Sequence, residues 1–232
     1  MWSNSFNKKI NPIMTTLKIL KMATMLSFGL TSCNAKSPET ETKLTKLTTT
    51  VSESSTTQIL TITKVKKPWY AWRSLVVGKM EKTIPEYQAI KGLNQKFYSF
   101  TENHKKFGGL YFWETQQDAD NWFNQAWFER TEKKYGEKGI VEYYKVQNVK
   151  TIATGNSNEK DLYATITHLK EATFSVDVSA DGLLKILTLA DDKNQTCYLT
   201  LWQNQKKALN YFATKNLTNE FFDVPFFIVN KK

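Results

Sequence analysis

The sequence predicts an α+β fold made of one repeated unit, and three observations lead to this prediction. Short runs with alternating polarity and many β-branched residues are typical of strands, and they surround segments whose apolar residues recur at helical spacing. Residues 58–150 present these patterns in the order β-α-β-β-α-β, and residues 160–232 repeat most of that order in a shorter form. Because this is the order of a ferredoxin-like unit, we expect two such units in tandem.

The first copy is expected to begin with a strand and a broken helix. The stretch "ILTITKV" (59–65) alternates in polarity and is rich in β-branched residues, which favours a strand. Pro68 suits a helix start, and Pro85 must break or kink the helix that follows. The apolar residues at helical spacing between them are Trp69, Trp72, Leu75, Val76 and Met80.

Three more strands and one helix complete the first copy. The strands are predicted at 93–100, 107–114 and 140–149. The helix is predicted at about 118–135, with Thr115 as its N-cap, Asp118 at the third position of a capping box and Gly136 as its C-cap.

The second copy follows the first closely in its middle part. The stretch "CYLTLWQNQKKALNYF" (197–212) aligns without a gap with "GGLYFWETQQDADNWF" (108–123), and "VPFFIV" (224–229) is matched to "VEYYKV" (141–146). The first helix is badly eroded, since "TFSVDVSAD" stands where the first copy has more than twenty residues. We therefore expect one complete copy and one shortened copy.

A lipoprotein signal is predicted over residues 1–32. Lys18 and Lys21 precede the apolar run "MATMLSFGL" (22–30), which is too short to span a bilayer and is typical of an export signal. The run ends in "LTSC", an apolar residue and two small ones before Cys33, which resembles the lipobox of bacterial lipoproteins. The resemblance implies that Cys33 is diacylated, with palmitate as a typical acyl chain, and becomes the new N-terminus.

The predicted anchor sets the expected location and partner of the protein. Acylated Cys33 would hold the protein on the lipid bilayer of the bacterial cell envelope, with the periplasmic face of the outer membrane as the expected site; an uncleaved apolar anchor is the alternative. Residues 33–57 are nearly all Thr, Ser, Lys and Glu, and are expected to form a flexible tether. Translation starts at Met1 or at Met14.

The charge of the chain argues against nucleic acid as a partner. The formal net charge is +10, and loss of residues 1–32 removes four lysines and no acids, which leaves +6. The remaining lysines are scattered through turns and helix ends rather than gathered in a stripe, which is typical of a solvated surface. With Cys33 acylated, Cys197 has no partner and is expected to be a buried structural thiol.

The first copy, about residues 58–149, resembles the antibiotic-biosynthesis-monooxygenase-like family, most closely its YdhR-like branch of small candidate mono-oxygenases. The segments that carry the resemblance are Gly92-Leu93, "GGLYFWET" (108–115), "DADNWFNQAWFERTEKKYG" (118–136) and "VEYYKV" (141–146). Such proteins dimerise as an α+β barrel in which two four-stranded sheets face each other. Together with the repeat, this implies an intrachain barrel and a monomer that is pseudo-dimeric.

The resemblance also implies a ligand pocket between the sheet and the helices of each copy. There, oxygenation without a cofactor relies on the substrate's own electron-rich ring, so no organic cofactor or metal is expected. The residues expected to line the pocket are Trp69, Trp72, Arg73, Tyr111, Trp113, Asn121 and Trp122. Core packing is the alternative for each tryptophan, since aromatic side chains at helical spacing are mostly buried for stability. No catalytic residue is identified.

Haem degradation and metal binding are disfavoured. Haem-degrading relatives have a tryptophan that matches Trp122, but their haem-ligating histidine falls at Glu132 and their strand asparagine near Thr63. His104 and His168 are alone in polar or edge positions, and two separate histidines do not form a metal site.

Two functions remain open. The first is a cofactor-independent oxygenase of an aromatic or apolar small molecule; the alternative is a non-catalytic lipoprotein that binds an apolar ligand or a partner protein. Only an open cavity of several hundred cubic ångströms in the first copy, with converging polar groups, is compatible with the enzyme.

The glycines of the first copy bear on the same question. Gly108 and Gly109 align with Cys197 and Tyr198 of the second copy, which implies that the fold itself does not need glycine there. The features not shared between copies, the glycine pair and Tyr111, are therefore expected to serve function.

Overall fold

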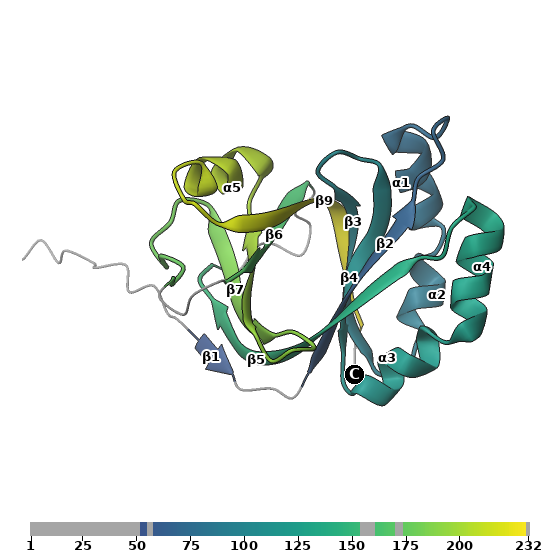
Figure 1. The fold of residues 1–232 in the computed structure, drawn as a ribbon, viewed down its shortest axis with the longest axis horizontal. Coiled ribbons are helices and arrows are strands. Elements are labelled where there is room, and N and C mark those ends of the chain that lie inside the picture. Colours follow the sequence, from purple (N-terminus) through teal and green to yellow (C-terminus); the bar gives the residue numbers. More distant parts are fainter. Residues whose placement is uncertain (1–51, 55–57, 154–160, 170–173, 231–232) are drawn as a thin grey trace, which may run out of the picture. The chain divides into compact units, whose positions relative to one another are not determined.

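The computed structural model describes residues 52–54, 58–153, 161–169 and 174–230 (Figure 1). The expected signal at 1–32, the acylation site Cys33 and most of the expected tether at 33–57 lie outside the described residues. The last part of that tether contributes a short strand, β1 (Ser52–Ser54), which pairs with β5. No helix in the described ranges has the length and apolar character that crossing a membrane requires.

The expected order of elements is confirmed in both copies. The first copy consists of β2 (Ile59–Lys66), α1 (Arg73–Glu81), α2 (Ile84–Gln88), β3 (Leu93–Thr101), β4 (Lys106–Trp113), α3 (Gln116–Trp122), α4 (Gln125–Tyr135) and β5 (Ile140–Thr151). The second consists of β6 (Leu162–His168), β7 (Leu183–Ala190), β8 (Thr196–Trp202), α5 (Gln205–Phe212) and β9 (Thr218–Val229).

The strands of the two copies close into one antiparallel barrel. The hydrogen-bonded order is β5-β2-β4-β3-β9-β6-β8-β7, and β7 pairs with β5 to complete the ring. Each copy contributes its four strands in the same relative order, fourth-first-third-second, and β3–β9 and β5–β7 are the two junctions between copies. The predicted pair of ferredoxin-like units in an intrachain α+β barrel is therefore confirmed, and the copies share a single sheet.

Strand registers confirm the ungapped part of the repeat. Thr61 of β2 lies opposite Tyr111 of β4, and Thr165 of β6 lies opposite Thr200 of β8, as the alignment requires. The turn before the second strand is also repeated. The carbonyl of Gly92 accepts a hydrogen bond from the backbone of Glu114 at 2.8 Å, and that of Gly182 accepts one from Gln203 at 2.9 Å.

The expected match between 224–229 and 141–146 is wrong. Tyr143 lies opposite Thr61 and Phe221 lies opposite Thr165, so "NEFFDV" (219–224) is the true counterpart of "VEYYKV". The end of β9 is instead used at a junction, because it leaves β6 and pairs with β3. The apolar residues at the end of β9 belong to the junction that closes the barrel. An alignment of one copy with the other carries no information about that junction.

Both expected helices of the first copy are divided. Pro68 lies five residues before α1, while Pro85 falls in the first turn of α2, where a missing backbone donor costs little. The second helix is split into α3 and α4 because Asn124 caps a new start, accepting a hydrogen bond from Trp127 N at 3.2 Å. The predicted caps at its outer ends are confirmed, with Thr115 accepting from the next turn and Gly136 in the left-handed region at φ 81°.

Apolar side chains fill the barrel and also cover its outer face. Leu110 and Phe112 point into the barrel, whereas Tyr111 and Trp113 point outward. Figure 1 shows α1 to α4 on the outer face of the first copy's strands and α5 alone on that of the second. Among the described residues, the first copy therefore has three more helices than the second under which a site can form.

Candidate functional site

A cavity of about 400 Å³ lies between the first copy's strands and helices α1, α2 and α4. It meets the requirement set by the sequence, an open space of several hundred cubic ångströms with converging polar groups. Its lining includes Met80, Tyr87, Lys96, Tyr98, Tyr111 and Arg130. Aromatic rings and one deeply buried amine give this cavity its character.

The amine belongs to Lys96 of β3, whose residue is only 2% exposed. Its Nζ lies 3.0 Å from the ring centroid of Tyr87, 3.8 Å from that of Tyr98 and 4.7 Å from that of Tyr111. We call these three residues the tyrosine cage. Within the described part of the chain, Lys96 Nζ forms no hydrogen bond and no ion pair.

Burial decides the protonation of this group. Burial lowers the pKa of Lys96 well below its usual range, and the charge of Glu86 opposes this only in part. The ring faces of the cage also favour the ammonium form, but by about 0.5–2 kcal/mol, which is less than the desolvation of a lysine in an apolar interior. Burial likewise raises the pKa of Tyr111 well above its usual range, so its hydroxyl keeps its proton.

Strand alternation and Gly109 leave the space for the Lys96 side chain. Lys96 faces the helices, and Gly109 lies on the neighbouring strand, where a Cβ would approach Lys96 Cε to 3.1 Å and Phe97 O to 2.8 Å. A Cβ on Gly108 would lie 2.1 Å from the carbonyl oxygen of Thr63. The expectation that the fold does not need these glycines is therefore wrong for this copy, because its strands approach too closely for a side chain.

The tyrosine cage is not repeated in the second copy. The registers place Ile186 where the first copy has Lys96, Thr188 in place of Tyr98, and Thr200 in place of Tyr111. The corresponding outer face is packed by the cluster that contains Val176, Ile186, Trp202, Ala208 and Phe212. The two copies thus share a framework, but only the first carries the buried amine.

The seven residues expected to line the pocket are dispersed. Tyr111 lines the cavity, while Trp113 is fully buried beneath it and donates a hydrogen bond from Nε1 to Thr61 Oγ1 at 2.9 Å. Trp122 contacts the cage from the side, with its ring centroid 5.5 Å from that of Tyr87. Asn121 is exposed and accepts a hydrogen bond from Gln117.

Trp69 and Trp72 do not reach the cavity. They are 93% and 67% exposed, because they lie before α1 begins rather than on its buried face. Sequence reasoning missed Lys96, Tyr87 and Tyr98. The alternation of "NQKFYSF" was a usable signal, since it places Lys96 and Tyr98 together on the outer face that the helices cover.

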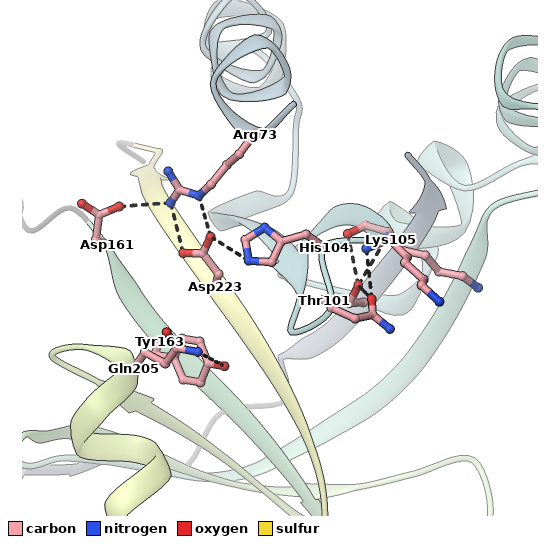
Figure 2. Close-up of polar contacts among 10 residues, drawn as sticks. Arg73, Thr101, His104, Lys105, Asp161, Tyr163, Gln205 and Asp223 are labelled. Atoms are coloured by element: carbon pink, nitrogen blue, oxygen red, sulfur yellow. Dashed lines mark hydrogen bonds and ion pairs between the residues drawn. The ribbon is translucent and has the colours of Figure 1, made fainter. Parts of the chain in front are cut away.

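Arg73 contributes to a second cavity of about 360 Å³ at a junction of the copies (Figure 2). Its Nε donates to Asp223 Oδ2 at 2.7 Å and its Nη2 to Asp223 Oδ1 at 3.1 Å, while Asp161 accepts a further bond at 3.1 Å. His104 lies 3.9 Å from Asp223 and stacks on Phe100. Because two carboxylates neutralise Arg73, we interpret this cluster as a clamp between α1 and β9.

Cys197 has the structural role expected of it. The residue is buried, its Sγ lies 3.3 Å from His168 Nδ1, and burial raises the pKa of the thiol to about 11. A thiol with such a pKa is a poor nucleophile at neutral pH. Among the described residues, no group of three or more potential ligands that could hold a metal ion is present.

Comparison with known proteins identifies the fold. A candidate monooxygenase from Fusobacterium nucleatum subsp. nucleatum ATCC 25586 superposes with a TM-score of 0.52 at 15% identity, over 76% of this chain and 95% of the other. An anthrone oxidase-like protein superposes with a TM-score of 0.56 at 8% identity, over 78% of this chain and 98% of the other. No protein-family model and no curated protein matches the sequence. The chain therefore has the fold of monooxygenase-like α+β barrels, formed here by two copies in one polypeptide.

Proposed function

We propose that the first copy binds an aromatic or other apolar small molecule in its cavity of about 400 Å³. The observation that carries this proposal is the asymmetry of the copies: the outer face of the second is packed by apolar side chains, whereas the first holds a cavity under its additional helices. The volume lies within the range of about 300–1,000 Å³ typical of small-molecule sites. The tyrosine cage favours a ligand with flat or apolar surfaces.

A neutral hydrophobic dye tests this proposal. We expect N-phenyl-1-naphthylamine to bind with increased fluorescence, and Ala71→Phe to weaken binding by about tenfold because the new ring enters the cavity. Met80→Phe is a second filling variant, and Ala126→Phe, at an exposed position of α4, is the matched control that should leave binding unchanged. Equal affinity of the wild-type protein and both folded filling variants would place the dye elsewhere.

Oxygenation of the bound molecule without a cofactor is the second candidate function. It is supported by the shared fold with a candidate monooxygenase and an anthrone oxidase-like protein, and by an amine in the cavity that can accept a proton. Oxygen consumption by the purified protein with quinol or polyphenol substrates distinguishes it from binding alone. Dye binding without any oxygen consumption supports the non-catalytic function.

We further propose that the folded barrel is anchored to the bacterial cell envelope through acylated Cys33, on its periplasmic side. The support is the basic, apolar and lipobox segments that precede this residue. In bacteria that express the full chain, labelled palmitate should be incorporated and the protein should partition into detergent. Cys33→Ala is expected to abolish both, whereas Cys197→Ala, the matched control, is not. Equal labelling of the Cys33→Ala protein contradicts the anchor.

A further inference from the structure

We propose that the ligand of the first copy's cavity is an apolar carboxylic acid bound as its anion, with Lys96 as the group that receives the carboxylate. This inference rests on the proposed function, because it names the chemical class of the molecule that the cavity binds. It is argued from the partners that Lys96 lacks, from the charges around the cavity and from its apolar walls.

Lys96 has three ring faces as neighbours but no acid. Cation–π contacts are individually weak, and a buried amine with no hydrogen-bond acceptor loses the interactions that it had with water. Glu86 acts on Lys96 through its charge, but no ion pair joins them. A carboxylate that enters the cavity supplies both the acceptor and the opposite charge, at a depth where an ion pair is little screened by water.

The charged residues of the lining also favour an anion. Three are cationic at the cavity edge and one is acidic, Lys79, Arg130 and Lys134 against Glu86, and the Lys96 amine can add a fourth positive charge when it is protonated. Lys79, Arg130 and Lys134 are exposed and come from the two helices α1 and α4 that flank the cavity, whereas Lys96 is deep within it. Such a field raises the local concentration of anions and guides them inward.

The rest of the lining fits the apolar part of the molecule. The side chains of Val76, Met80, Phe107 and Trp127, together with the tyrosine cage, enclose the space above Lys96. Burial raises the pKa of Tyr111, so its hydroxyl stays protonated near the amine. We infer a ligand with one carboxylate at the Lys96 end and a hydrophobic body towards the helices.

Binding of such a ligand should take up a proton. Where the Lys96 amine is deprotonated in the empty cavity, it, the carboxylate and one proton from solvent combine to give an ammonium–carboxylate pair, with no other bond formed or broken. The titratable groups that face Lys96 from the packed elements are Lys79 of α1, Glu86 and Tyr87 of α2, Tyr98 of β3, Tyr111 of β4, and Arg130, Lys134 and Tyr135 of α4. None of the tyrosines of the cage ionises near neutral pH, because burial raises the pKa of each.

Calorimetry with matched probes tests the inference. At pH 7.5 we expect 2-naphthoate to bind at least about tenfold more tightly than 2-naphthylmethanol, which has the same ring system and no charge. Titration in phosphate and in Tris, which differ in ionisation enthalpy, should show proton uptake, of at most one proton per site, for the naphthoate and none for the alcohol. Decanoate and decanol, used in the same way, distinguish an aliphatic acid from an aromatic one.

Lys96→Met should remove both the preference for the acid and the proton uptake, while the alcohol still binds. Lys133→Met, at an exposed position of α4 outside the cavity lining, is the matched control and should retain both the preference for the acid and the proton uptake. Equal affinity for acid and alcohol without proton uptake overturns the carboxylate inference alone, whereas failure of every probe to bind overturns the proposed function itself. Proton uptake that persists in the folded Lys96→Met protein overturns the assignment to Lys96. The wild-type measurement needs no variant, so a Lys96→Met protein that does not fold leaves the inference testable.

Discussion

Replacing Trp113 by alanine is expected to lower the free energy of unfolding by about 3–5 kcal/mol, the usual range for truncating a buried tryptophan. Trp113 is fully buried, stacks on Tyr111 with a centroid distance of 6.0 Å and meets Phe123 edge-on at 5.8 Å. Its loss also leaves the hydroxyl of Thr61 without the indole donor that it accepts from at 2.9 Å. Urea denaturation followed by circular dichroism measures the change.

The repeat supplies the controls for this prediction. Trp202 is the counterpart of Trp113 and is equally buried, so Trp202→Ala should cost a similar free energy of unfolding. Trp69, which is 93% exposed, should change stability by no more than about 0.5 kcal/mol when replaced by alanine. Only Trp113→Ala should also weaken dye binding, because Trp113 supports the ring of Tyr111 in the cavity. If Trp113→Ala costs no more than Trp69→Ala, the tryptophan is not part of the core.

Much of the fold could be predicted from the sequence because the alternation that marks a strand is visible within a short stretch of residues. Alternation in "ILTITKV", and the ungapped match of residues 108–123 to 197–212, depend on which face each residue presents and not on distant partners. Closure of the barrel was different. It depends on β9 changing its partner from β6 to β3, and the match of 224–229 to the wrong segment shows that an internal alignment cannot reveal a junction between copies.

The candidate site was less predictable because its members come from separate elements. Trp69 and Trp72 do recur at helical spacing in the sequence, but the helix begins only at Arg73. Neither tryptophan therefore lies on the buried face of a helix, and both are exposed. Lys96 looks in the sequence like any charged residue of an edge position. Its significance arises only when α2 brings Tyr87 over it and Gly109 leaves room beside it.

A different lysine, Lys64, joins the two copies inside the barrel. Its Nζ lies 2.7 Å from Glu142 Oε1 and 2.6 Å from Glu220 Oε2, and its side chain is only 9% exposed. Glu142 lies opposite Ile62 and Glu220 opposite Ile166, so the two glutamates occupy equivalent positions in the two copies. Burial lowers the pKa of Lys64, but the bonds to the glutamates more than offset this, and the net pKa is raised.

Lys64→Met is therefore expected to lower the free energy of unfolding by about 2–3 kcal/mol at pH 7. Breaking a fully buried ion pair costs about 3–5 kcal/mol; the expected value is smaller because the side chain of Glu220 is 44% exposed. Two carboxylates then remain together without a cation. The matched control is Lys66→Met. Lys66 Nζ lies 3.6 Å from Glu137 Oε2 in an exposed ion pair, so its replacement should change the free energy of unfolding by no more than about 0.5 kcal/mol.

Removing the two glutamates as well as Lys64 separates the effect of charge from that of packing. Because the pKa of Lys64 is raised on folding, its stabilising charge is fully present below its unfolded pKa and is lost only as pH rises through the higher folded value. The wild-type protein should thus gain the full contribution of Lys64 at pH 7. Adding Glu142→Gln and Glu220→Gln to Lys64→Met should recover most of the lost stability at pH 7, because no buried carboxylate is then left without its cation. A loss that the double glutamine change does not reduce would mean that Lys64 stabilises the barrel through its aliphatic stem rather than its charge.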